Sequence, residues 1–521
     1  MEAILSGNLT IVTFFPLVGI PVILFVSLVN KNSKTHVMTA AFVVMAVEFL
    51  LSLPLFINFE VGTAGMQFTE HLPWIQSLGI SYFLGIDGIS LFLVLLTTFM
   101  MPITMLSAWN AIGERVTAFC VLMLVLQTAL VGTFTALDMV LFFTFWEAVL
   151  IPMYFIIGLW GAERRIYAAI KFFIYTAFGS ALMLVAIFYL YYSHIEQFGT
   201  PSMSIIDLYR VELPYLGLMS PQGLCFLAFF LAFAIKVPLF PFHTWLPDAH
   251  VEAPTPGSVV LAAILLKMGT YGLLRFLLPL FPEATTDLLP WICVISIIGI
   301  IYGAMVAFAQ VDLKKLIAYS SVSHMGLVML GIFVLNVQGM EGSIYQMLSH
   351  GLSTGALFII VGMIYERRHT KLIKDFGGIS KSMPIFAAFF LISTLSSIGL
   401  PLLNGFIGEF LILLGVFRFN YVYSALGATG VVLGAVYMLW AYQRVMLGPL
   451  DKEENKALLD LNLREIFVLL PITVMMFFMG IYPKPILERI EPSVAGLLKT
   501  KYSHVMVVES PAVTEAGSKS Q

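Results

Sequence analysis

The sequence predicts an all-α polytopic membrane protein with about 14 transmembrane helices. Apolar residues make up 60% of the 521 residues and charged residues only 11%, whereas soluble domains are about 45–50% apolar and about 25% charged. Mean hydropathy is +0.95. The apolar residues form continuous runs that reach the roughly 20 residues a helix needs to cross a bilayer. This continuity excludes a transmembrane barrel, whose strands alternate apolar and polar residues.

Composition also excludes several functional classes. The net charge of −3 leaves no basic surface for nucleic acid. Cys120, Cys225 and Cys293 stand singly in apolar stretches, so they predict no disulfide framework, metal site or iron–sulfur cluster. No Lys or Arg precedes Lys31, which argues against a signal peptide. We therefore expect any redox chemistry that this protein serves to take place on other chains.

Fourteen apolar runs follow one another along the chain. Their approximate limits are 11–29, 37–57, 87–108, 116–135, 137–160, 167–192, 222–247, 256–279, 288–309, 315–335, 342–366, 384–416, 424–447 and 463–482. The seventh run contains Pro238, Pro241 and Pro247, and the twelfth contains Gly399 and Pro401. Because proline has no N–H and breaks a helix interior, we expect these two spans to be discontinuous.

The distribution of basic residues predicts the orientation of the spans. With the N-terminus outside, the inner loops carry sixteen Lys and Arg residues and the outer loops two, Arg210 and Arg418. The inner ones are Lys31, Lys34, Arg115, Arg164, Arg165, Lys314, Lys315, Arg367, Arg368, Lys371, Lys374, Lys381, Arg444, Lys452, Lys456 and Arg464. Inner loops of membrane proteins are enriched in Lys and Arg, so both termini are expected on the outer side.

The two broken spans also indicate an internal duplication. The run 235–239 (Ile-Lys-Val-Pro-Leu) resembles 398–402 (Ile-Gly-Leu-Pro-Leu), and 179–182 (Gly-Ser-Ala-Leu) resembles 354–357 (Thr-Gly-Ala-Leu). Each copy has five spans, an odd number, so the second copy enters the membrane from the opposite side, as in transporter inverted repeats. The alternative is that the prolines merely kink two ordinary spans. The predicted units are 1–115 (three spans), 116–279 (first repeat), 288–447 (second repeat) and 448–521 (last span and tail).

Ionisable side chains at membrane depth are the candidate functional residues. We single out six of them, no two of which share a span: Glu147, Lys236, Lys267, His324, His350 and Glu409. A charge at the bilayer centre costs at least about 2.5–3.5 kcal/mol of insertion free energy. We therefore expect such residues to have a role that offsets this cost. A Glu–Lys pair would keep both groups charged, and separating the pair would favour a neutral lysine that has released its proton. For the histidines, the alternative is a hydrogen-bonded side chain in a packed core.

Other polar residues in the spans carry weaker signals. Glu48 lies mid-span outside both repeats, where a peripheral or lipid-facing position is as reasonable as a functional one. Lys171 and Arg275 lie near span ends, where long basic side chains extend to the headgroups. Asp87 begins a span, as a helix cap does.

Three motifs resemble the antiporter-like membrane subunits of respiratory complex I. They are Phe145-Trp146-Glu147-Ala148, the run from Ala234 to His250 (AIKVPLFPFHTWLPDAH), and Ala253-Pro254-Thr255-Pro256. The same superfamily includes subunits of Mrp-type antiporters and membrane-bound hydrogenases. Within it the chain is similar to the M type of NADH-quinone oxidoreductase subunits, because Glu409 stands where other types usually have Lys. The roughly 39 residues after the last span are also too few for the lateral helix and extra span of the L type.

The resemblance implies a role for each candidate residue and for the protein. Glu147 resembles the partner of a pump lysine, Lys236 resembles that lysine, and Glu409 resembles the exit-side group. Lys267, His324 and His350 resemble the polar axis between half-channels. Asp138 and Glu48 have no role in this scheme. The implied activity is proton translocation in a bacterial inner-membrane NADH:quinone reductase. Its NADH, FMN, iron–sulfur clusters and quinone would be bound by partner subunits, and L- and N-type chains and the peripheral redox arm would be neighbours.

Two other functions remain open from the sequence. One is a subunit of an Mrp-type cation/proton antiporter or a membrane-bound hydrogenase, which shares the motifs. The other is a membrane scaffold without an ion path, in which the six buried ionisable residues would tolerate neutral replacement.

Overall fold

The computed structural model describes residues 8–29 and 33–503, so Lys31 lies outside the described residues. The first elements are α2 (Leu9–Val29), α3 (Lys34–Ile57), β1 (Gln67–Ile75), η1 (Gln76–Leu78), β2 (Ile80–Ile86), α4 (Ser90–Ala111), α5 (Val116–Thr135), α6 (Met139–Ala148), α7 (Leu150–Trp160), α8 (Arg165–Phe198), α9 (Ile205–Leu208), α10 (Pro221–Lys236), α11 (Trp245–Glu252) and α12 (Thr255–Val260). The next are η2 (Leu261–Leu265), α13 (Leu266–Gly272), η3 (Leu273–Leu277), α14 (Leu278–Leu280), α15 (Pro282–Phe308), α16 (Leu313–Phe333), α17 (Val337–Arg368), η4 (Ile373–Asp375) and η5 (Ile379–Lys381). The chain continues with α18 (Pro384–Ser397), α19 (Asn404–Phe419), α20 (Tyr421–Met446), α21 (Glu453–Lys456), α22 (Leu463–Ile481) and α23 (Lys484–Lys501).

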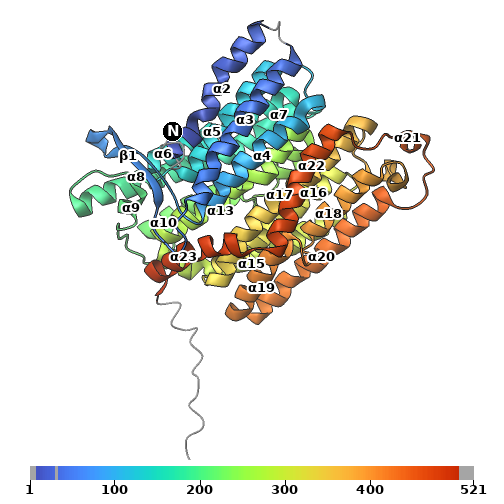
Figure 1. The fold of residues 1–521 in the computed structure, drawn as a ribbon. Helices are drawn as coiled ribbons and strands as arrows, with labels where there is room; N and C mark the ends of the chain where they lie inside the picture. The colour runs from blue at the N-terminus through green and yellow to red at the C-terminus, as the bar shows by residue number, and fades with distance from the viewer. Residues whose placement is uncertain (1–7, 30–32, 504–521) are drawn as a thin grey trace, which may run out of the picture.

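The helices form one bundle, which confirms the predicted all-α polytopic fold (Figure 1). Within the described residues, twelve helical segments are long and apolar enough to cross a membrane. The two further predicted spans are the broken ones, and their first halves, α10 and α18, are shorter apolar helices. The chain is interrupted between α10 and α11 and again between α18 and α19, at the predicted prolines.

Several of these helices begin with a capping residue. Its side chain accepts hydrogen bonds from the first backbone amides of the helix. Asp138 accepts from the amides of Val140 and Leu141 at the start of α6, and Asn462 forms a capping box with Glu465 at the start of α22. Such caps satisfy N–H groups that have no partner inside the helix. Asp138, for which the resemblance implied no role, therefore has a structural one.

A two-stranded antiparallel hairpin lies between α3 and α4, and the sequence analysis did not predict it. Strand β1 pairs with β2, with Leu72 opposite Tyr82. Figure 1 shows the hairpin and α23 at the same end of the bundle. At this end the amide of Gly88 donates to the Ser493 hydroxyl on α23. The hairpin and α23 thus cover one end of the spans.

Three of the six candidate residues, Lys267, His324 and His350, lie on the most buried helical segments. In α17 and in the segment Thr255–Leu280, every residue of the most apolar window is buried, and in α16 94% are. The corresponding share is 28% in α3 and α20. Because α16, α17 and Thr255–Leu280 form the centre of the bundle, their polar side chains face protein rather than lipid.

One prediction about polar residues in the spans was wrong, and one of the two alternatives left open for Glu48 is excluded. Arg275 does not extend to the headgroups: it is 5% exposed, and its Nη2 lies 2.5 Å from the Asp87 carboxylate. Asp87 is the predicted cap, accepting from the amides of Ile89 and Ser90, and it is also the partner of this buried charge. Glu48 does not face lipid, because it is fully buried.

Candidate functional site

The first break places a lysine at the end of α10. Helix α10 ends at Lys236, because Pro238 cannot donate the next helical hydrogen bond. The Trp245 indole at the start of α11 donates to the carbonyl of Ile235 at 2.8 Å. This bond satisfies a backbone group exposed by the break, so the irregular segment is held in one position next to Lys236.

Lys236 is buried without a hydrogen-bond partner. Its side chain is 1% exposed, and its Nζ makes no hydrogen bond. The Nζ lies 4.9 Å from the ring centroid of Trp146 and 5.9 Å from that of Phe172, within the range of a cation–π interaction. Glu147 lies within electrostatic range, but the buried Oε1 of this carboxylate also has no hydrogen-bond partner. Among the described residues no ion pair joins Glu147 to Lys236, so of the paired and separated arrangements the structure shows the separated one.

The span that carries Lys267 contains two π-helical turns that the sequence analysis did not predict. They are η2 and η3, on either side of α13. Lys267 is fully buried, and its Nζ donates to the carbonyl of Ala262 within η2 at 2.5 Å. A π-turn leaves backbone carbonyls less regularly bonded and is frequent at functional sites. Here it supplies an acceptor to a lysine that forms no ion pair with any acidic residue in the described part of the chain.

From Lys267 a series of neighbouring polar side chains leads into the second half of the bundle. Lys267 Nζ is 2.8 Å from His350 Nδ1, and the rings of His350 and His324 are 5.7 Å apart between centroids. His324 Nδ1 lies 3.5 Å from Oε1 of Glu409. We call these four residues the Lys267–Glu409 row. Each is less than 10% exposed.

The second break positions the last residue of the row. Helix α18 ends at Ser397, and Gly399 follows with a φ of +71°. A Cβ atom at Gly399 would lie 2.3 Å from Oε2 of Glu409, so only glycine leaves room for this carboxylate. Gln346 on α17 donates to Glu409 Oε1 at 3.3 Å. A small cavity of about 10 Å³ beside His324 and Glu409 has about the volume that one water molecule requires.

Lys236 and the row are close, but no polar contact among the described residues joins them. Gly269 on α13 fits against the backbone of α10, where an added Cβ would lie 2.9 Å from both the Phe233 carbonyl and the Val237 amide. Glycine therefore allows the helices of Lys236 and Lys267 to approach closely. The structure brings Lys267, His350, His324 and Glu409 into one row and leaves Glu147 and Lys236 as a separate pair.

Two polar residues near the row were not among the predicted site residues. His250 on α11 is fully buried, neither ring nitrogen has a hydrogen-bond partner, and the ring stacks on Phe358 at 4.5 Å. It lies within electrostatic range of Lys267 and of Lys314. Lys314 on α16 is 5% exposed and donates to the carbonyl of Ala253 at 2.6 Å. His250 could have been identified, because it ends the quoted motif, whereas Lys314 looked like an ordinary loop lysine.

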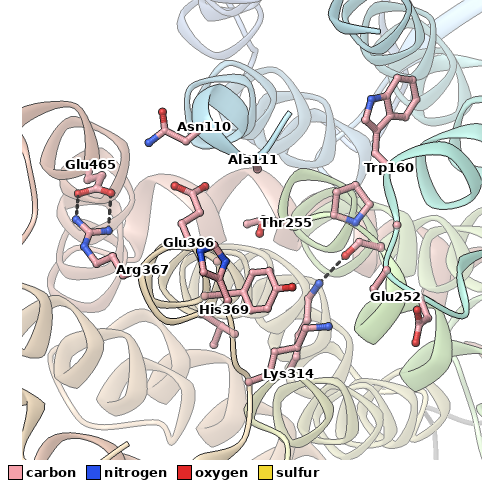
Figure 2. Close-up of a pocket in the computed structure, with 18 of the residues that line it drawn as sticks. Asn110, Ala111, Trp160, Glu252, Thr255, Lys314, Glu366, Arg367, His369 and Glu465 are labelled. Carbon is pink, nitrogen blue, oxygen red and sulfur yellow. Dashed lines mark hydrogen bonds and ion pairs between the residues drawn. The ribbon is translucent and has the colours of Figure 1, made fainter. Parts of the chain in front are cut away.

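Lys314 also lines a cavity of about 520 Å³ (Figure 2). We call it the Lys314 cavity. Most of the basic residues assigned to the inner side lie on five predicted loops. Each of these loops contributes a residue to the wall of the cavity: Asn110, Gly161, Lys314, Lys371 and Asn462. Glu252 and Glu366 place carboxylates in the same wall. The cavity thus connects one end of the bundle with Lys314, which lies near the Lys267–Glu409 row.

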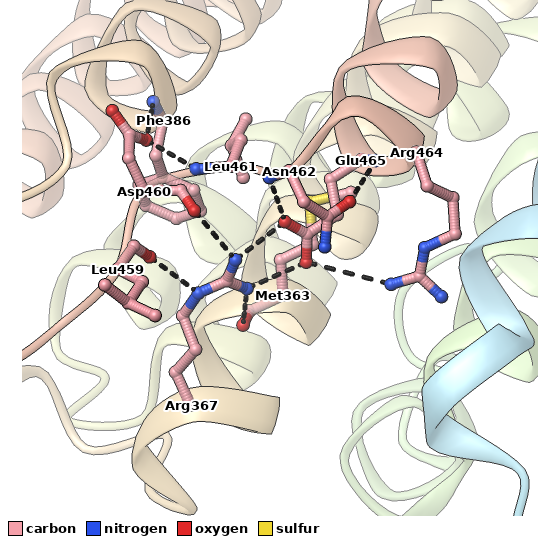
Figure 3. Close-up of polar contacts among 9 residues, drawn as sticks. All are labelled: Met363, Arg367, Phe386, Leu459, Asp460, Leu461, Asn462, Arg464 and Glu465. Carbon is pink, nitrogen blue, oxygen red and sulfur yellow. Dashed lines mark hydrogen bonds and ion pairs between the residues drawn. The ribbon is translucent and has the colours of Figure 1, made fainter.

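A cluster around Arg367 closes one side of this cavity (Figure 3). Arg367 at the end of α17 donates to both carboxylate oxygens of Glu465, at 2.8 and 2.6 Å. It also donates to the carbonyls of Leu459 and Asp460. The Asp460 carboxylate in turn accepts from the first amides of α18. The cluster joins α17, α18 and α22 at the end of the bundle where the cavity lies.

Comparisons with known proteins agree with the resemblance. Residues 136–434, which include all six predicted site residues, match the family described as NADH:quinone oxidoreductase/Mrp antiporter, TM. The chain is 47% identical to NADH-quinone oxidoreductase subunit M of Rhodobacter capsulatus, over 96% of this chain and 98% of that one. It is 44% identical to the subunit of the same name of Rickettsia prowazekii, over 94% of this chain and 98% of that one.

Solved structures share the fold. A chain of respiratory complex I from Thermus thermophilus with bound NADH aligns with a TM-score of 0.84 and 31% identity, over 94% of this chain and 99% of that one. A chain of the Mrp complex from a Dietzia species aligns with a TM-score of 0.80 at 18% identity, over 96% of this chain and 99% of that one, which shows a common fold. On this evidence the chain belongs to the NADH:quinone oxidoreductase/Mrp antiporter family of membrane proteins.

Proposed function

We propose that the chain is a proton-translocating subunit in the membrane arm of an NADH:quinone oxidoreductase. The observation that carries this proposal is the Lys267–Glu409 row, because it is a chain of proton-exchanging side chains in the centre of an apolar bundle. Burying an ionisable group in a membrane costs free energy. A role in proton transfer explains why four such groups lie in one row. The names of the relatives at 44–47% identity support the assignment to this enzyme.

The proton-transfer residues in this proposal are Glu147, Lys236, Lys267, His324, His350 and Glu409. A histidine accepts a proton on one ring nitrogen and releases one from the other, so His350 and His324 relay between Lys267 and Glu409. In the separated arrangement of Glu147 and Lys236, the buried lysine has no counter-ion in contact and tends to release its proton. If Glu147 and Lys236 moved into contact, the lysine would take up a proton and become charged again. Moving a proton against the membrane potential requires about 2.3 kcal/mol per 100 mV, and quinone reduction elsewhere in the complex supplies this energy.

We place proton entry at the Lys314 cavity. The cavity admits water to Lys314, and His250 lies within electrostatic range of both Lys314 and Lys267. Glu252 and Glu366 in the wall add proton-exchanging carboxylates. These side chains form a route from the end of the bundle to the start of the row.

We propose that residues 116–279 and 288–447 are two inverted repeats. In each, the fourth of five membrane elements is the broken one, α10–α11 in the first and α18–α19 in the second. The third element is the longest unbroken helix in each, with 34 residues in α8 and 32 in α17. The shared order of elements supports duplication rather than two unrelated kinks.

We propose that the protein lies in a bacterial inner membrane with both termini on the outer side. The Lys314 cavity, lined by the basic loops, would then face inward, and the hairpin and α23 would face outward. NADH, FMN, the iron–sulfur clusters and quinone would be bound by partner subunits, among them L- and N-type neighbours in the membrane and the peripheral redox arm.

Replacement of Lys236 or Glu147 by alanine tests the proposal. We expect either variant to leave the complex assembled and to lower quinone-linked NADH oxidation and proton pumping sharply, because each removes one partner of the pair. Lys456→Ala is the matched control, since this lysine is 47% exposed and should have no effect. Full coupled activity of assembled Lys236→Ala and Glu147→Ala complexes would refute the proposal.

A cation/proton antiporter of the Mrp type is the second candidate. The Mrp chain at 18% identity supports the fold alone, whereas the relatives at 44–47% identity favour the oxidoreductase. Purification of the native complex separates the two, because only the oxidoreductase oxidises NADH with a quinone as acceptor.

A further inference from the structure

Helix α11, the second half of the first broken helix, ends in contacts with other elements. The last four carbonyls of a helix have no hydrogen-bond partner within that helix. At the end of α11, the successive carbonyls of residues 250–253 each accept a hydrogen bond from outside the helix. In the order of these carbonyls, the donors are the Ser258 hydroxyl at 2.9 Å, the Lys371 ammonium at 2.8 Å, the Ala162 amide at 2.8 Å and the Lys314 ammonium at 2.6 Å.

Two of these four donors are lysines of the proposed second repeat, Lys314 and Lys371. We call them the α11 clamp. Positive groups stabilise the C-terminus of a helix, because the helix dipole is negative there. The two ammonium groups lie within electrostatic range of each other, so they repel. The carbonyls of α11 and the carboxylates of Glu252 and Asp312, which lie within electrostatic range of Lys314, offset this repulsion.

The clamp attaches α11 to two helices of the Lys267–Glu409 row. Lys314 is the second residue of α16, which carries His324, and Lys371 follows α17, which carries His350. A ring contact adds to the attachment. His250 of α11 stacks on Phe358 of α17, with the ring centroids 4.5 Å apart and the planes at 6°. The C-terminus of α11 is thus fixed to the helices that carry the two histidines of the row.

The opposite end of α11 belongs to the surroundings of Lys236. The indole of Trp245, the first residue of α11, donates to the carbonyl of Ile235 at 2.8 Å. The Trp245 ring also lies 5.4 Å from the ring of Phe172, one of the two rings near Lys236 Nζ. A helix of eight residues is only about 12 Å long. A shift of its C-terminus therefore displaces Trp245 as well.

From these contacts we propose that the α11 clamp positions Trp245, and through it Lys236, for proton transfer. This inference rests on the proposed function of Lys236. The clamp residues are positioning residues, because in this role they act through α11 rather than on the transferred proton. For Lys314 the role is additional to its place in the proposed entry route. Displacement by about 1 Å at a reacting group can cost 10²-fold, so release of α11 impairs transfer at Lys236.

Lys371→Met tests the clamp, because Lys371 is not part of the proposed proton route. Methionine keeps an unbranched side chain but has no ammonium group. In the purified complex we expect the backbone amides of residues 245–254 to exchange with deuterium at least about 10-fold faster, since a hydrogen bond to a charged group opposes local opening. Quinone-linked proton pumping should fall at least about 10-fold, because Trp245 is no longer held in place.

Two variants show whether position is the cause. Lys371→Arg keeps a positive donor that does not release its proton, so it should restore slow exchange and pumping close to the wild type. Lys374→Met is the matched control, because this exposed lysine lies in the same segment and should change neither measurement. Wild-type exchange or wild-type pumping in Lys371→Met would overturn the inference. A loss of pumping that Lys371→Arg does not restore would overturn it too.

Lys371→Gln keeps the test informative if Lys371→Met does not assemble. The amide is shorter and uncharged, so α11 should again exchange faster and pumping should fall, both to a smaller extent than with methionine. Exchange and pumping equal to the wild type would contradict the clamp. Because deuterium exchange does not depend on pumping, failure of the clamp is distinguishable from failure of the proposed function, which Lys236→Ala tests.

Discussion

At the scale of single residues, the structure separates side chains that the sequence made look alike. Lys236 and Lys267 are both buried lysines in apolar spans, but Lys236 lies over aromatic rings without a hydrogen bond. Lys267 donates to a carbonyl and contacts a histidine. Lys236 is thus free to respond to Glu147, whereas Lys267 is already part of the row. Arg275 differs from both lysines, because it forms a buried ion pair with Asp87.

Gly399→Ala tests the position of the last residue of the row. The added Cβ would collide with Glu409 Oε2, so we expect Glu409 to move away from His324. Because displacement by about 1 Å at a reacting group can cost 10²-fold, quinone-linked pumping should fall at least about 10-fold, measured in an assembled complex. Gly448→Ala is the control: its φ is +92°, but nothing lies within 4 Å of the added atom. Equal pumping by both variants would show that the collision does not matter.

At the scale of elements, the broken helices depend on contacts outside themselves. Asn404, the first residue of α19, has its side-chain oxygen bonded by Ser396 and its carbonyl bonded by Ser349 of α17. The start of α18 is capped by Asp460, which belongs to the Arg367 cluster. Each half of the second broken helix is therefore attached to α17, the helix that carries His350.

Arg367→Ala should loosen these elements. The change leaves Glu465, whose side chain is 2% exposed, as a buried charge with a weaker partner. Removal of one partner of a buried pair costs about 3–5 kcal/mol, so we expect a clear fall in thermal stability of the purified complex. Lys456→Ala breaks an exposed pair with Glu453 and should cost less than about 1 kcal/mol. Similar stability of the two variants would contradict a structural role of the cluster.

At the scale of the whole molecule, the two ends of the bundle have different chemistry. One end carries the Lys314 cavity with its basic and acidic wall. The other carries the hairpin and α23, with exposed Leu72 and Trp74. The central helices connect these ends, and the proposed function has protons entering at the cavity and leaving near α19 through Glu409.

Cysteine labelling tests this orientation. Trp74 in the hairpin is 57% exposed, and the Glu453 side chain at the other end is 84% exposed. We expect a membrane-impermeant maleimide to label Trp74→Cys in intact spheroplasts and to label Glu453→Cys only after permeabilisation. The native Cys120, Cys225 and Cys293 are all buried, so they provide a low background. The reverse pattern would invert the assigned topology.

The sequence alone determined the spans, the two breaks and the six candidate residues, because each has a local cause. Continuous apolar runs, prolines within them and isolated charges in apolar surroundings are visible without knowing which helices touch. The hairpin and the π-turns were missed, because short strands have little signal beside long apolar runs and a π-turn depends on packing around Lys267.

Only the tertiary structure decided which polar groups meet. Residues 83 positions apart, Lys267 and His350, lie 2.8 Å apart, whereas Lys236 Nζ and Glu147 Oε1 have no hydrogen-bond partner among the described residues. Arg275 was misplaced, and the position of Glu48 was left open, for the same reason: the neighbouring helix determines a side chain's partner, and nearly every face of these helices is apolar. Sequence therefore specifies which groups are buried in the membrane, and helix packing specifies which of them lie in contact with one another.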